Sequence, residues 1–455
     1  MISRIAVRLR WLRKKINRTH WAALLLGIRT PSGEADMPGL IMIQLDGLSR
    51  NQMERALAAG RLPFLAQLIK RGHFTLESFY SGIPSSTPAV QGEIFYGVRA
   101  AVPSFAFLRR AKGKVFRMNE ASPAAEIENE LVNRCPEPLL KGGCAYSNIY
   151  QGGARFSRYC AQDLAPERFF NRLRPLKGLF LCIVYAPKIL RMAGLALLEF
   201  ALAVFDMFKG LYQREDFFKE LIFVPSRVLV CIVLREMIRF RALLDIERGV
   251  QLIHANFLGY DEQAHRRGPD SAFAHWTLLG IDRAIRDICR AAAHSTFRDY
   301  EWIIYSDHGQ ERSVLFPRKH GRSIEAAVRE VFSRGPLAGA EFWVSRVPEI
   351  LGNTFERWEQ YLGFKESSRE SPAEPENQII LTAQGPVGHI YLPKRPTPDE
   401  MESYARSLVE AGVPLVLLRR PDGEVAAFNC RGSWSLPEDR VEILGSEHRF
   451  LSRRT

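Results

Sequence analysis

Six side chains of the kinds that bind divalent metal ions follow predicted strands or turns in this 455-residue chain: Asp46, Asp261, His265, Asp307, His308 and His389. Carboxylate oxygens and imidazole nitrogens bind zinc and harder cations, and catalytic metal sites keep one position open for substrate. Taken singly, each residue is more often a turn or helix-capping residue. Together, three aspartates and three histidines are enough for two metal sites with three protein ligands each.

Three of these residues follow apolar stretches that predict strands. Asp46 follows Leu40–Leu45, so its carboxylate projects from the strand end where the chain turns. Asp307 and His308 follow a second strand and precede Gly309. Neighbouring side chains can reach one ion only if the backbone turns between them, and glycine supplies that freedom.

The remaining candidates lie in two further motifs. Asp261 and His265 are four residues apart in GYDEQAHRRGP, which places them on one face of a helical turn. His389 starts a predicted strand in GPVGHIYL, directly after a glycine.

A nucleophile candidate lies in the segment SGIPSSTPAVQGEIFYG. Thr87 precedes Pro88, and proline favours the first turn of a helix, which predicts Thr87 at the N-cap of a helix over Ala89–Tyr96. The positive end of the helix dipole suits an oxyanion and an incoming phosphate. A capping role alone would also explain Thr87, and Ser85 and Ser86 are rival nucleophiles farther from the helix start.

These motifs need a scaffold that brings them together. The sequence alternates apolar strands with helices, which predicts an α/β fold with a doubly wound, mostly parallel sheet covered by helices on both faces. Ligands of such sheets bind at the carboxyl ends of the strands, so the acidic clusters should converge there. The predicted strands are Leu40–Leu45, Leu252–Phe257, Trp302–Tyr305, Ile379–Thr382, His389–Leu392 and Leu415–Leu418. The predicted helices are Gln52–Arg71, Ala272–Ala293, Ser323–Phe332 and Pro398–Ala411.

The net charge of +13 is concentrated at the N-terminus, where residues 1–30 carry eight basic side chains and no acidic one. The same segment holds apolar residues, which favours an amphipathic arm (residues 1–36) at an anionic membrane surface over a nucleic-acid-binding body. A solvated tail, or a helix packed on the body, is an equal alternative. The seven scattered cysteines form no CxxC pair, which favours a reduced, cytoplasmic protein.

The middle of the chain departs from the strand–helix alternation. Residues 121–249 include two strongly apolar stretches interrupted by charges, so they predict a helical insertion or cap on a catalytic domain made of residues 37–120 and 250–455. Neither stretch has the ~18–20 uncharged residues of a spanning helix. Contact of residues 178–233 with a membrane is the second interpretation.

In this order, the motifs resemble the type I phosphodiesterase and nucleotide pyrophosphatase branch of the alkaline phosphatase superfamily. The resemblance runs from Ile41 to Leu392 and implies a hydrolase of phosphate esters with two metal ions, usually zinc. It implies that Thr87 is the nucleophile and forms a covalent phospho-threonine. One metal would be held by Asp46, Asp307 and His308, and the other by Asp261, His265 and His389.

One departure from that branch bears on the substrate. The family's phosphate-binding asparagine after the nucleophile helix has no counterpart here, where Ser104 and Phe105 stand. Arg99 and Arg109 are the substitute candidates for substrate binding. The departure, the apolar insertion and the basic arm together favour a lipid-linked substrate. Alternatives are a phosphomonoesterase, a sulfatase or a phosphoglycerol/phosphoethanolamine transferase on the same site, or a catalytically silent membrane-associated scaffold.

Overall fold

The computed structural model describes residues 18–28, 31, 33, 35–164, 175–212, 217–314, 316–334, 337–345, 378–384, 387–420, 423–436, 438–439 and 443. Its strands are β1 (Gly39–Leu45), β2 (Ala106–Arg109), β3 (Lys114–Arg117), β4 (Cys144–Tyr146), β5 (Phe156–Arg158), β6 (Leu252–Phe257), β7 (Tyr300–Tyr305), β8 (Glu341–Ser345), β9 (Gln378–Gln384), β10 (Val387–Tyr391), β11 (Val416–Arg419), β12 (Val425–Asn429) and β13 (Gly432–Leu436).

The helices are α2 (Arg18–Leu25), α3 (Arg50–Ala58), α4 (Pro63–Lys70), α5 (Thr87–Tyr96), α6 (Ala121–Arg134), α7 (Pro175–Tyr212), α8 (Phe217–Val228), α9 (Arg235–Glu247), α10 (Gly259–Arg267), α11 (Ala272–Ala293), α12 (Phe316–His320), α13 (Ile324–Phe332) and α15 (Pro398–Glu410). Short helical turns are η1 (Arg110–Lys112), η2 (Ala161–Leu164) and the π-helical η4 (Leu229–Leu234).

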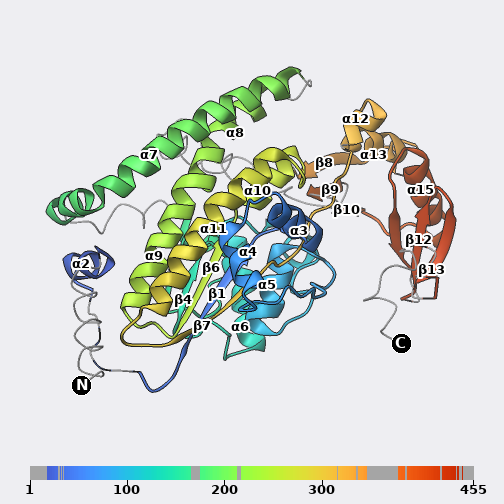
Figure 1. Cartoon of the computed structure of the whole chain (residues 1–455). Coiled ribbons are helices and arrows are strands. Elements are labelled where there is room, and N and C mark those ends of the chain that lie inside the picture. Colours follow the sequence, from blue (N-terminus) through green and yellow to red (C-terminus); the bar gives the residue numbers. More distant parts are fainter. Residues whose placement is uncertain are drawn as a thin grey trace, which may run out of the picture. The chain divides into compact units, whose positions relative to one another are not determined.

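The site is carried by a five-stranded sheet in the order β5-β4-β6-β1-β7. Every neighbouring pair in it is parallel, and β1 pairs in register with β6 from Leu40↔Leu252 to Leu45↔Phe257. Helices cover both faces (Figure 1). This is the predicted α/β architecture, and it is consistent with an alkaline-phosphatase-like fold.

The two faces of this sheet differ in polarity because side chains alternate along each strand. The face toward α9 and α11 is apolar: Ile41, Ile43 and Leu45 of β1 join Ile253, Ala255 and Phe257 of β6 in the main core. The opposite face carries the polar residues Gln44, His254 and Asn256, all fully buried. A buried polar layer therefore lies beside the strand ends that carry the predicted site.

The chain forms two compact units. The first comprises residues 1–105, 117–312 and 348–366 and contains the five-stranded sheet; the second comprises 106–116, 313–347 and 367–455. In the second unit β8 pairs parallel with β9, β9 antiparallel with β10, and β11, β12 and β13 form an antiparallel sheet. The division predicted from the sequence, at residues 36, 120 and 249, stays a prediction.

Most predicted elements agree with the structure, and Ala272–Ala293 and Leu252–Phe257 do so to the residue. The single helix predicted over Gln52–Arg71 was wrong. Gly60 adopts φ +65° after α3 and ends it, and Pro63 then starts α4. The carboxylate of Asp282 caps α4 by accepting hydrogen bonds from the backbone N–H groups of its second and third residues, at 2.9 and 3.0 Å.

The middle region contains more than helices. Strands β4 and β5, which the sequence pattern did not predict, extend the main sheet on one side. The two apolar stretches form α7 and α8, which pack against each other as a hairpin. Among the described residues, no helix is both long and apolar enough to traverse a bilayer. The basic arm before residue 18 lies outside the described residues.

Candidate metal and nucleophile site

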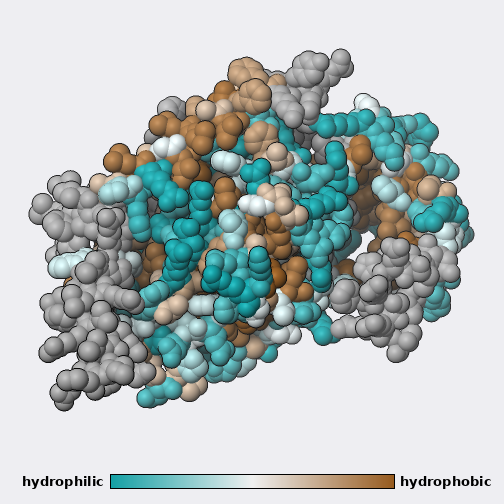
Figure 2. Space-filling view, in the orientation of Figure 1, coloured by the Kyte–Doolittle hydropathy of each residue, from teal (hydrophilic) through white to brown (hydrophobic). Residues whose placement is uncertain are grey.

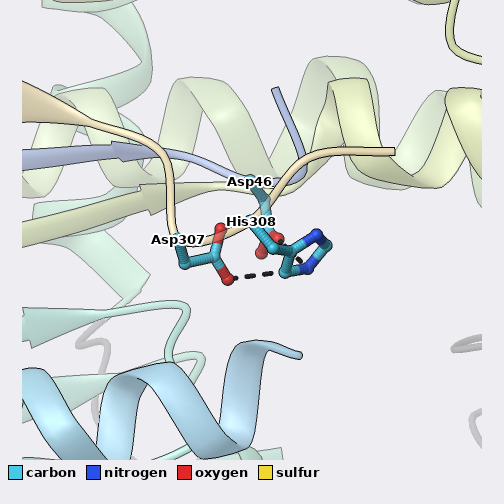
Figure 3. A group of neighbouring side chains, drawn as sticks. All are labelled: Asp46, Asp307 and His308. Carbon is cyan, nitrogen blue, oxygen red and sulfur yellow. Dashed lines mark ion pairs between the residues drawn. The ribbon is translucent and has the colours of Figure 1, made fainter. Parts of the chain in front are cut away.

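Asp46, Asp307 and His308 meet at the carboxyl end of the central strands (Figure 3). Asp46 follows β1, and the other two follow β7, its neighbour in the sheet. His308 Nε2 lies 3.6 Å from Asp46 Oδ1 and 3.7 Å from Asp307 Oδ2. One ligand atom from each residue lies within 4.8 Å of the others. Parallel pairing of β1 and β7 therefore joins residues 261 positions apart in sequence.

Thr87 lies in the same group. Its hydroxyl donates a hydrogen bond to Asp46 Oδ1 at 3.3 Å, and its Oγ1 is 3.2 Å from His308 Nε2. It is the first residue of α5, and Ser86 is the N-cap, so the predicted N-cap position was wrong by one residue. The hydroxyl still lies at the positive end of the α5 dipole. Helix capping alone would not require the contact of Thr87 with Asp46.

Two loops hold these groups by close backbone contacts. Leu48 donates its backbone N–H to Ser306 Oγ at 2.9 Å, and Gly47 donates to Asp307 Oδ1 at 3.4 Å. A Cβ atom at Gly309 would lie 2.7 Å from the Cβ of Ser49. The glycine in the Asp-His-Gly motif is therefore needed for the approach of the two loops.

Asp261 and His265 form a pair on α10, beside this group. His265 Nε2 is 3.3 Å from Asp261 Oδ2, as their four-residue spacing on one helical face predicts. Asp261 also accepts a hydrogen bond from the side chain of Gln310, in the loop after β7. A Cβ added to Gly47 would collide with Asp261 Oδ1. The Asp261–His265 pair therefore adjoins the cluster of Asp46, Asp307 and His308 through Gly47.

Asn256 supports Asp46 by a hydrogen bond and was not among the residues predicted from the sequence. Asn256, on β6, donates from Nδ2 to Asp46 Oδ2 at 2.9 Å and to the carbonyl of Ser147 at 3.2 Å. Farther along the same face, Gln91 of α5 donates to Gln44 at 3.2 Å. The signal was present in the sequence of β6, LIHANF, where polar residues interrupt an otherwise apolar strand.

The electrostatics of the cluster are those of crowded carboxylates. Burial, and after it the charges of Asp307 and Asp261, raises the pKa of Asp46 well above its ordinary value. Burial disfavours a charged imidazole, but the three surrounding aspartates outweigh it and raise the pKa of His308 to about 9. Burial likewise opposes the charge of Asp261, but His265 lowers the pKa of Asp261 to about 2. The site therefore has more acidic than basic side chains, so a bound cation would be stabilised there.

These residues fit a divalent metal ion on their own terms. Asp307 is fully buried, and its Oδ2 has no hydrogen-bond partner in the described part of the chain. A buried carboxylate oxygen without a donor is costly unless a cation compensates it. The donor set of carboxylates and imidazole is that of zinc and similar ions. Asp46, Asp307 and His308 could therefore hold one metal ion.

For three predicted residues, a role in this site stays a prediction. His389 is on β10 of the second unit, where its ring stacks on Tyr391 at 6.0 Å, so its role as a ligand stays a prediction. Arg109 ends β2 of the same unit and lies 5.6 Å over the ring of Phe116. Arg99 is an exposed residue paired with Glu93 at 3.0 Å. Substrate binding by either arginine stays a prediction.

Comparison with known proteins gives one match. Residues 213–411 match the family described as type I phosphodiesterase / nucleotide pyrophosphatase. The matched region contains α10, the Asp-His-Gly motif and His389, whereas Asp46 and Thr87 precede it. No curated protein and no solved structure matches the chain.

Proposed function

We propose that this chain cleaves phosphodiesters with Thr87 as the nucleophile. Residues 213–411 match the type I phosphodiesterase / nucleotide pyrophosphatase family of the alkaline phosphatase superfamily, and a domain of this family implies a metal-dependent hydrolase. The observation that carries the proposal is the position of the Thr87 hydroxyl, 3.3 Å from Asp46 Oδ1 and 3.2 Å from His308 Nε2. A hydroxyl held among candidate metal ligands at a helix N-terminus is placed for attack on phosphorus.

We assign the metal ligands in two sets. Asp46, Asp307 and His308 would hold one ion, and Asp261, His265 and His389 would hold the second. Divalent metal ions, for which we propose zinc, lower the pKa of a hydroxyl group and offset phosphoryl charge. The raised pKa of Asp46 supports a cation at the first set, because burial and the charges of Asp307 and Asp261 disfavour the carboxylate and added positive charge would offset both effects.

The residues then act in two displacements. Asp46 orients the Thr87 hydroxyl, and Thr87 Oγ loses its proton as it forms a bond to phosphorus. The bond from phosphorus to the leaving alcohol breaks, and the departing oxygen takes up a proton. This leaves a covalent phospho-threonine. Water then displaces Thr87 from phosphorus, the threonine oxygen regains a proton, and a phosphate monoester is released.

The substrate is proposed to be a lipid-linked phosphodiester, met at an anionic membrane surface on the cytoplasmic side. Support comes from the basic residues before α2 and from the apolar hairpin of α7 and α8. The expected asparagine shortly after α5 is replaced by Ser104 and Phe105, which argues against assigning this chain the nucleotide substrate of related enzymes. Arg99 and Arg109 remain the proposed hydrogen-bond donors to the phosphate group of the substrate.

The deciding experiment compares turnover of a bis-aryl phosphate with that of an aryl monophosphate, each with and without a chelator. We expect faster turnover of the diester, lost on chelation and restored by zinc. Preference for the monoester would indicate a phosphomonoesterase, and turnover of an aryl sulfate a sulfatase. Release of a headgroup to an acceptor alcohol would indicate a phosphoglycerol or phosphoethanolamine transferase. No turnover of any ester by metal-loaded protein would indicate a silent scaffold.

A further inference from the structure

The outer face of the α7–α8 hairpin is apolar where a solvent-facing helix is normally polar. On α7, Leu190 and Leu197 are 72% and 71% exposed, and Phe205 and Phe208 are 68% and 62% exposed. Spacings of seven, eight and three residues put all four on one helical face. Arg191 is the one charged residue among the exposed positions from 186 to 208.

Helix α8 continues the pattern. Its exposed positions include Phe217, Leu221 and Pro225, and Leu229 of η4 follows at the same four-residue interval. Figure 2 shows the hydrophobic surface gathered along the upper edge of the molecule, over α7 and α8. Contiguous exposed apolar surface of this kind marks an interaction site.

Three charged residues of the hairpin lie on its inner face. Glu199 and Asp206 of α7 are 2% and 1% exposed, and Arg227 of α8 is fully buried between them, with ion pairs to both. Arg267 of α10 adds an ion pair to Asp206 at 2.6 Å. These pairs fix which side of α7 faces the protein, because turning the helix would leave buried charges without partners. The apolar side is therefore held outward.

The positive charge of the N-terminal segment indicates what covers this apolar face. Helix α2 packs against α7 and lies within residues 1–30, which carry eight basic and no acidic side chains. A second copy of the chain would bring a second basic segment to the same interface, and the two would repel each other. A bilayer containing anionic phospholipid offers both apolar depth for the helix face and negative charge for the basic segment.

We propose that the outer face of α7 and α8 docks into the headgroup and upper acyl region of an anionic membrane, with both helices lying along its surface. This goes beyond the proposed reaction and names the surface on which a lipid-linked substrate would be met. Docking is tested by binding alone, so its failure and the failure of the proposed hydrolysis are separate results.

The experiment is flotation of the full-length protein with vesicles of phosphatidylcholine, with and without phosphatidylglycerol. We expect binding to vesicles that contain phosphatidylglycerol, and a fall of about tenfold or more in partitioning for Leu197→Ser with Phe205→Ser, since each substitution removes buried apolar area. The matched control is Leu417→Ser on β11, which is 58% exposed and lies outside the hairpin. Unchanged thermal unfolding and unchanged turnover of a water-soluble aryl diester confirm that the variants fold.

Four outcomes would overturn the proposal. In the first, the parent protein does not float with anionic vesicles at low salt, and in the second it binds phosphatidylcholine alone equally well. In the third, the hairpin variant floats as the parent does. In the fourth, sedimentation without lipid shows that the parent is a dimer and the hairpin variant a monomer. The last result would assign the face to a second copy of the chain.

Discussion

Asn256 holds the carboxylate of Asp46 from the side opposite Thr87: its Nδ2 lies 2.9 Å from Asp46 Oδ2, while Thr87 contacts Asp46 Oδ1. Both oxygens of Asp46 therefore have fixed partners. A ligand carboxylate that is oriented in this way loses less freedom when it binds an ion, and such supporting hydrogen bonds tune metal affinity.

Replacing Asn256 with alanine should therefore weaken metal binding without removing a ligand. We expect the zinc affinity to fall by about 10- to 100-fold, as for other residues that orient metal ligands. Competition with a chromophoric chelator measures the affinity. Gln44→Met is the control, because Gln44 is an equally buried amide of the same sheet face whose contacts are Gln91 and Tyr305. Equal affinity in the parent and N256A would contradict the orienting role.

Thr87→Ala should abolish diester turnover, by about 10³-fold or more, because no other group replaces a nucleophile that forms a covalent bond. Zinc content should stay that of the parent, since Asp46, Asp307 and His308 are unchanged. Thr87→Ser keeps the hydroxyl and should retain part of the rate. The comparison variant Ser85→Ala removes the rival hydroxyl, which contacts Ser81 at 2.8 Å. It should change diester turnover little. Full activity in T87A with loss in S85A would reassign the nucleophile.

Much of this arrangement was predictable from local sequence. The strand ends after Leu45 and Tyr305 are marked by apolar runs followed by aspartate, and the parallel pairing of β1 and β7 brings them together. Asp261 and His265 share a helical face because their spacing is four. These inferences depend on short-range periodicity, which a single sequence displays.

Other features depend on tertiary contacts that no single segment encodes. The position of Asn256 behind Asp46 requires the register of β1 against β6. The short strands β4 and β5 have too few residues to show an alternation pattern. The inward orientation of Glu199 depends on the partner Arg227, 28 positions away. The ligand role of His389 stays a prediction.

Gly47→Ala separates backbone strain from a collision in the site. Gly47 has φ +69°, and a Cβ there would meet Asp261 Oδ1. Any L-residue at such a φ costs about 1–2 kcal/mol. We expect G47A to lose this stability and, in addition, most of its activity, because Asp261 must move. Turnover and thermal unfolding are measured together.

The matched control is Gly60→Ala. Gly60 has φ +65° with no atom within 4 Å of an added Cβ, so this variant carries the same strain without the collision. It should lose similar stability and keep its activity. Equal activities of G47A and G60A would show that the approach of Asp261 to Gly47 has no part in the site.

Asp307→Asn tests whether Asp307 contributes to binding of a metal ion. The charge of Asp307 repels Asp46 and attracts His308, so its removal relieves one interaction of the metal-free protein and loses the other. The parent should gain about 2.7 kcal/mol from zinc at 100 times its Kd, a gain that D307N should largely lose. Thermal unfolding with chelator and with zinc gives both values. A D307N variant that gains as much stability from zinc as the parent would argue against Asp307 as a metal ligand.

His254 should make the protein acid-sensitive below neutral pH. Its ring is fully buried, with Tyr305 Oη at 2.7 Å, and burial lowers its pKa from 6.5 to about 3. Between these two values the unfolded chain binds one proton more than the folded one, so stability falls as pH falls, by up to about 1.4 kcal/mol per pH unit. His254→Gln should remove that part of the slope between pH 6.5 and 4, whereas His294→Gln, at an exposed histidine, should leave it unchanged. Denaturant unfolding across this range measures the slope, and an identical slope in H254Q and the parent would assign the acid sensitivity to other groups.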